Sequence, residues 1–213
     1  MKPLSFPDLT LATLARLTQF EEQEQDRAFW EALAEPLTEK EIAETQVLQE
    51  RLRRLPIMPL NEATLWARAI YPLLMLAETS RIIAWSEVSI GAQWETFALE
   101  GVVDGTLAAG PLGAAEAPYL VVMEAKRGFE GKNPQPQLFG QLLVAATINQ
   151  KTEAFGAYTV ADIWTFVRAE IVLSAGAPTT LRVMLSPEYA ERSEAGQILK
   201  ILKGIVAKQV AVE

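Results

Sequence analysis

The 213-residue sequence contains no cysteine and no histidine. Without cysteine the chain has no disulfide, thiolate nucleophile, redox pair or zinc ribbon. Without histidine it has no Ser-His-Asp triad, no imidazole general base and no histidine-rich zinc site. Any catalysis must therefore depend on carboxylates, lysine, hydroxyls or a metal bound through oxygen. Mg²⁺ and Mn²⁺ prefer oxygen ligands, so they are the cofactors to expect.

Long apolar runs are also absent from the sequence. No stretch reaches the roughly 18 to 20 apolar residues that span a bilayer, and the first residues contain no apolar signal-peptide core. We therefore expect a cytoplasmic protein with no membrane partner. There is no Gly/Ser-rich linker, internal repeat or low-complexity tract, so the length suits one sizeable domain.

Positive charge is scarce in this chain. The formal net charge is −8 and the isoelectric point is near 4.8, which argues against a general nucleic-acid coat, because phosphate binding favours a basic surface. Much of the acidity is local and lies before residue 50: Glu21, Glu22, Glu24, Asp26, Glu31, Glu35, Glu39, Glu41 and Glu44. The remaining chain is closer to balanced, so a basic groove is not excluded.

Residues 1–58 are predicted to form an N-terminal helical extension packed on the main domain. Apolar residues recur at helical spacing over residues 11–33, which predicts a first helix with an acidic outer face. Thr38 and Glu41 have the spacing of a capping box, which predicts the start of a second helix over 38–54.

Residues 59–213 are predicted to form an α/β domain, with a central mixed sheet flanked by helices. A helix is expected from the N-cap Asn61 toward Glu78, with a kink or restart at Pro72. The following segments are expected to be strands 82–91 and 94–107 with a turn at 91–93, strand 119–126, helix 137–150, strands 154–159 and 163–171, and helix 189–210. Leu181–Leu185 is either a short strand or an extended turn.

Three charged residues converge on the hairpin predicted around residues 101–126. Glu124 and Lys126 are two residues apart at the end of an apolar strand, so both project to one face about 7 Å apart. An antiparallel neighbour about 4.8 Å away would bring Asp104 beside them. A solvated ion pair is the simpler interpretation. The apolar strand that precedes Glu124 favours a metal site, because a divalent cation relieves the repulsion between two nearby carboxylates.

Five segments together resemble the PD-(D/E)XK nuclease superfamily. The resemblance is to the restriction-endonuclease-like domain found at the amino terminus of type I restriction R subunits and in small bacterial proteins. It covers roughly residues 60–171. In chain order the segments are Glu62 in NEATLWARAIYPLL, Asp104 in EGVVDGTL, Glu124-Ala125-Lys126 in VVMEAKRG, the helix with Gln137 and Gln141, and FGAYTVADIWTF with Trp164 and Phe166.

The resemblance implies a restriction endonuclease-like fold and Mg²⁺- or Mn²⁺-dependent hydrolysis of phosphodiester bonds, with DNA as the expected partner. Asp104, Glu124 and the Ala125 carbonyl would bind the metal, and Glu62 would complete its outer shell or hold a metal-bound water. Lys126 would orient or help to deprotonate the attacking water and stabilise charge at phosphorus.

The helix glutamine of the family has two candidates here, because Gln137 and Gln141 lie on one helix face. Either would contact substrate or position Lys126. A tyrosine that often follows four residues later is absent after both.

The sequence contains four tryptophans after residue 60 that could be either core residues or base-stacking platforms. We interpret them as core aromatics: Trp66, Trp85, Trp94 and Trp164.

The sequence leaves a second function open. The alternative to a nuclease is an inactive nuclease-like fold that serves as a nucleic-acid-binding or assembly module. Many relatives in the superfamily cut as dimers, so a homodimer is also open, although no segment identifies a dimer face.

Overall fold

The computed structural model describes residues 2–24, 26–56, 60–110, 113–126, 133–174 and 177–210. Its helices are η1 (Phe6–Asp8), α1 (Leu11–Leu17), α2 (Arg27–Leu33), α3 (Glu39–Arg53), α4 (Glu62–Leu65), the π-helical turn η2 (Trp66–Ile70), α5 (Tyr71–Leu76), α6 (Gln135–Ile148) and α7 (Glu191–Val210). Its strands are β1 (Leu4–Ser5), β2 (Gln19–Gln23), β3 (Ile82–Gln93), β4 (Ala98–Ala109), β5 (Glu116–Lys126), β6 (Glu153–Val160), β7 (Ile163–Ser174), β8 (Ala177–Leu185) and β9 (Tyr189–Ala190).

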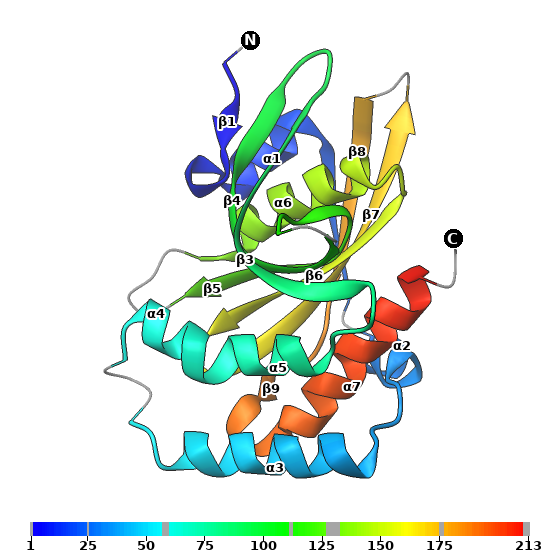
Figure 1. Ribbon diagram of the computed structural model, residues 1–213. Coiled ribbons are helices and arrows are strands. Elements are labelled where there is room, and N and C mark those ends of the chain that lie inside the picture. The colour runs from blue at the N-terminus through cyan, green and yellow to red at the C-terminus, as the bar shows by residue number, and fades with distance from the viewer. Residues whose placement is uncertain are drawn as a thin grey trace.

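Within the described ranges the strands form one mixed sheet (Figure 1). Its main path runs β1-β4-β5-β6-β7-β8-β2, while β3 pairs with β4 and β9 pairs with β7. The pairs β1/β4, β2/β8 and β5/β6 are parallel, and the other pairs are antiparallel. The α/β class with a central mixed sheet is therefore confirmed.

Helices cover both faces of the sheet and form a core on each side. Helix α6 packs on one face with Val122 of β5, whereas α5 and α7 pack on the other face with the neighbouring Val121 and Met123. This division follows from the strand, since successive side chains point to opposite faces. Helix α3 packs against α7 and forms an outer layer (Figure 1).

The prediction for the N-terminal segment was partly wrong. The single helix expected over residues 11–33 is divided into α1, β2 and α2, and β2 pairs in parallel with β8 far along the chain. Strand β1 likewise pairs with β4, so the segment joins the sheet and is not purely helical. Helix α3 was correctly predicted, with both hydrogen bonds of the Thr38/Glu41 capping box present. The predicted domain boundary at residues 58/59 lies outside the described residues.

Among the other predicted turns, strands and helices, some are confirmed and others are wrong. The turn expected at residues 91–93 is wrong, because β3 continues to Gln93 and the Trp94 amide donates to the Phe97 carbonyl at 2.8 Å. Leu181–Leu185 belongs to a full strand, β8, and the terminal helix starts after β9. Asn61 is the N-cap of α4 as predicted, and the helix passes through the π-helical turn η2 just before Pro72.

Candidate active site

Asp104 lies on β4 directly beside the Glu124-Ala125-Lys126 segment of β5. The register pairs Gly105 with Met123, which brings the preceding Asp104 across from Glu124. The Asp104 Oδ2 accepts a hydrogen bond of 2.7 Å from the Ala125 backbone amide. The hairpin predicted from sequence is therefore present, and this hydrogen bond to Asp104 links its two strands, β4 and β5.

Glu124 is completely buried, and each of its oxygens has a polar or charged partner. Its Oε1 forms an ion pair with the Lys126 ammonium. Its Oε2 accepts hydrogen bonds from the side-chain amides of Gln137 at 2.6 Å and Gln141 at 2.9 Å. These bonds compensate for the loss of water that burial of a carboxylate entails.

Both glutamines contact the same oxygen because α6 packs against β5 and carries them one helical turn apart. The sequence left open which glutamine belongs to the site and whether it acts on substrate or on Lys126. The structure brings both to Glu124.

The charged cluster at this site consists of Glu124, Asp104, Glu62 and Lys126, and the pKa values of its three carboxyl groups are all raised. Burial and then the neighbouring Asp104 charge raise the pKa of Glu124 to about 7, against lowering by Lys126 and Gln141. Burial also raises the pKa of Asp104 and of Glu62. Burial lowers the pKa of Lys126, but Glu124, Asp104 and Glu62 outweigh it, so the net shift is upward and the ammonium stays charged.

Glu62 reaches the cluster from the start of α4. It lines a cavity of about 360 Å³ whose other walls are Ala63, Trp66, Ser86, Glu87, Asp104 and Ala125. The Asn61 side chain accepts from the Thr64 amide at 2.8 Å, and this cap fixes where the helix begins and hence where Glu62 projects. All seven residues predicted to form the site, the metal-ligand candidate Ala125 included, thus lie around Glu124 or line this cavity.

Glu87 also lines the cavity, and sequence reasoning missed it. It lies on β3 across from Asp104, since its neighbours Ser86 and Val88 pair with Gly105 and Val103. Its φ of 54° is left-handed, and its charge contributes to the raised pKa of Asp104. The available signal was a single acidic residue within an otherwise uncharged strand.

The carboxylate oxygens at the cavity suit a hard divalent cation as ligands. The carboxylates of Glu62, Glu87 and Asp104 at the cavity and of the adjacent Glu124, balanced by Lys126, leave a net charge of −3 when all are ionised. Yet across the described ranges no three or more acidic side chains are gathered into a ready-made metal cluster. A bound metal would therefore need backbone carbonyl and water ligands as well.

A second completely buried carboxyl belongs to Glu191, at the start of α7. The Glu191 Oε2 accepts from the Trp164 indole N–H at 2.8 Å, and its Oε1 has no hydrogen-bond partner within the described part of the chain. The Glu191 amide donates to the Asp162 carbonyl, and the preceding Ala161 amide donates to the Lys126 carbonyl. The β6–β7 turn thus connects Glu191 to the backbone of Lys126.

The four tryptophans considered from sequence fall into two groups. Trp94 and Trp164 are buried as predicted. Trp66 and Trp85 are half-buried, and Trp66 lies at the cavity.

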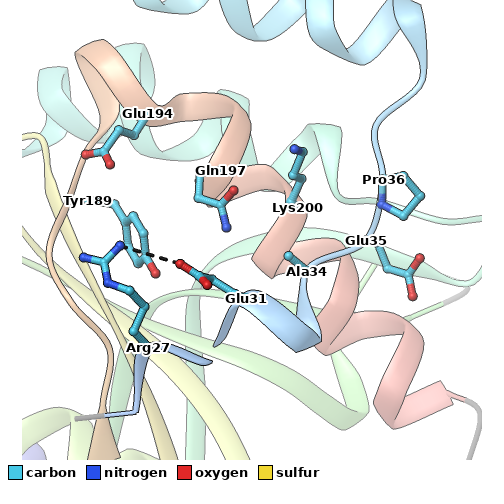
Figure 2. A pocket seen from close by; sticks show the side chains of 9 residues that line it. All are labelled: Arg27, Glu31, Ala34, Glu35, Pro36, Tyr189, Glu194, Gln197 and Lys200. Atoms are coloured by element: carbon cyan, nitrogen blue, oxygen red, sulfur yellow. Dashed lines mark ion pairs between the residues drawn. The ribbon is translucent and has the colours of Figure 1, made fainter. Parts of the chain in front are cut away.

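A larger hollow of about 600 Å³ lies elsewhere, between α2 and α7 (Figure 2). Its walls mix both charges, with Arg27 and Glu31 paired at 3.7 Å and Lys200 on the opposite side. None of the predicted site residues lines it.

Comparison with known proteins gives no independent assignment: no family model matches the chain, and no curated protein matches it. Among the described helices, none combines the length and apolar character needed to cross a membrane.

Proposed function

We propose that this chain is a metal-dependent nuclease that hydrolyses phosphodiester bonds, with DNA as the expected substrate. The observation that carries the proposal is the charged cluster at the end of β5, where Lys126 pairs with the buried Glu124 beside Asp104 and Glu62. Perturbed carboxyl pKa values beside a cavity are typical of catalytic groups. The ordered motifs that resemble the PD-(D/E)XK superfamily support the same chemistry.

Asp104, Glu124 and the Ala125 carbonyl would hold Mg²⁺ or Mn²⁺, and Glu62 would support a metal-bound water from the cavity wall. When bound, the metal supplies an activated water and neutralises charge on the scissile phosphate. Lys126 would have to move away from Glu124 Oε1 for that oxygen to become a ligand.

The remaining roles belong to the chain's own side chains. Gln137 and Gln141 hold the Glu124 carboxylate in one orientation through two hydrogen bonds to Oε2. Lys126, which stays protonated, places a positive charge where phosphate oxygens would approach the carboxylates. A homodimer and a cytoplasmic location stay predictions.

The proposal is tested by a nuclease assay on single-stranded, double-stranded and branched DNA and on RNA, each with Mg²⁺ or Mn²⁺. We expect cleavage of at least one substrate, lost in Asp104→Ala, Glu124→Ala and Lys126→Ala while circular dichroism shows an intact fold. Wild-type protein that cuts no substrate, or variants that cut as well as wild type, would contradict the proposal.

One observation favours the alternative of a catalytically silent binding or assembly module. Both oxygens of Glu124 already have a partner within the protein, which is also what a purely structural polar cluster requires. Titration calorimetry with Mn²⁺ separates the two functions. Binding that is lost in Asp104→Asn supports the nuclease, and the absence of any heat of binding supports the silent module.

A further inference from the structure

Trp66 occupies a position that the nuclease chemistry itself does not require. It is the first residue of the π-helical turn η2, directly after α4, and its half-buried side chain lines the cavity together with Asp104 and Ala125. π-helical turns occur frequently at functional sites. An aromatic ring therefore forms a wall of the cavity beside the proposed catalytic carboxylates.

The ring is held there by close packing against the hairpin. A Cβ on Gly105 would lie 2.3 Å from Cη2 and 2.4 Å from Cζ2 of the Trp66 indole, so the ring rests on the β4 backbone next to Asp104. Tyr71 braces it at a centroid distance of 6.2 Å, and the Tyr71 hydroxyl donates to the Ala84 carbonyl at 2.9 Å. The indole is thus fixed before any ligand arrives.

The cavity suits a ligand of limited size. Its volume of about 360 Å³ is at the lower end of ligand pockets, which are about 300–1,000 Å³, and it matches one nucleotide better than a duplex. Stacking of a base on an aromatic side chain contributes about 1–3 kcal/mol and tolerates any base. A base paired within a duplex has both faces covered by its neighbours and cannot stack in this way.

We propose that Trp66 stacks on an unpaired base of the nucleotide next to the scissile phosphate, so that the enzyme acts on single-stranded nucleic acid or on unpaired ends. This inference rests on the proposed nuclease function of the same site. DNA and RNA share the stacking chemistry, and the relative cleavage rates of a DNA and an RNA strand of the same sequence show which of the two is the substrate.

The test compares cleavage of a single-stranded DNA, the same sequence as RNA, and the DNA duplex, by wild type, Trp66→Phe and Trp66→Leu. Trp66→Leu should lower kcat/KM on the single strand about 5- to 150-fold, the equivalent of the stacking energy, and Trp66→Phe should retain most of the activity. Duplex cleavage by Trp66→Leu should change less than single-strand cleavage. The matched control is Trp85→Leu, because Trp85 is also half-buried but packs on the α6 side and does not line the cavity.

A second variant covers the case in which Trp66→Leu does not fold. Ala63 is exposed and lines the same cavity, so Ala63→Leu narrows the space beside Trp66 without disturbing the core. It should impair single-strand cleavage more than duplex cleavage. Equal loss on both substrates would contradict stacking.

The outcomes separate this inference from the proposed function. If wild type cleaves nucleic acid but Trp66→Leu and Ala63→Leu keep the wild-type ratio of single-strand to duplex cleavage, the stacking role is wrong and the nuclease stands. If wild type cleaves nothing, fluorescence anisotropy of a labelled thymidine oligonucleotide decides: binding weakened by Trp66→Leu supports stacking on a silent fold, and binding unchanged by it overturns the inference.

Discussion

The replacement Glu191→Gln should remove a large part of the pH dependence of stability. Glu191 is completely buried, and burial raises its pKa from the ordinary 4.5 to about 8, with the Trp164 hydrogen bond opposing and the Asp162 charge adding to the shift. Between these two values the folded protein keeps a proton that the unfolded chain has lost. Stability therefore falls as pH rises through this window, by about 1.4 kcal/mol per pH unit.

Summed over the window, the contribution of Glu191 amounts to roughly 5 kcal/mol as an upper value. The glutamine has nearly the same shape, stays neutral at every pH and still accepts from the Trp164 indole N–H. Below pH 4.5 the two proteins should have similar free energies of unfolding. Above pH 8 the variant should be more stable by several kcal/mol.

Urea denaturation of both proteins across this pH range measures their free energies of unfolding. In the difference between the two free energies, the contributions of the titrating groups that both proteins share cancel. A difference that grows steadily from pH 4.5 to about 8 is the expected result. A constant difference, or a variant that is less stable than wild type above pH 8, would refute the reasoning. Asp162 and Arg192, paired at 2.5 Å beside Glu191, are unchanged in both proteins.

Two further substitutions probe the site. Gln141→Leu removes a donor to the buried Glu124, and should lower the free energy of unfolding by about 1.5–3 kcal/mol above pH 7, where Glu124 is ionised, but by less below pH 4.5. Urea denaturation with no such pH difference would contradict a stabilising hydrogen bond from Gln141 to the Glu124 carboxylate. Gly105→Ala places a methyl group against the Trp66 ring and should cost about 1–3 kcal/mol. The double variant with Trp66→Leu should recover part of that loss, and strict additivity would show that the two residues do not clash.

Local signals in the sequence were reliable where local contacts determine the structure. The Thr38/Glu41 capping box and the Asn61 N-cap are each completed within three residues, and both are present. The period-2 pattern likewise placed Asp104 and Glu124 on neighbouring strands.

Features that depend on distant partners escaped the same reasoning. β2 is a strand because it pairs with β8, where Arg182 bonds to Glu21 at 2.8 Å, and nothing within residues 11–33 contains that information. The left-handed backbone of Glu87 and the partnership of both glutamines with Glu124 depend on how β3 and α6 pack. Spacing predicted which face Gln137 and Gln141 share, but not what lies opposite that face.

The most direct test of the nuclease assignment compares two lysines. Lys126 and Lys203 each pair with a glutamate, and their side chains are 21% and 26% exposed, but the partner of Lys203 is Glu41, away from the cavity. With Mn²⁺ and single-stranded DNA, Lys126→Ala should abolish cleavage and Lys203→Ala should cut at the wild-type rate. Equal rates for the two variants would contradict a catalytic site at Glu124 and Lys126.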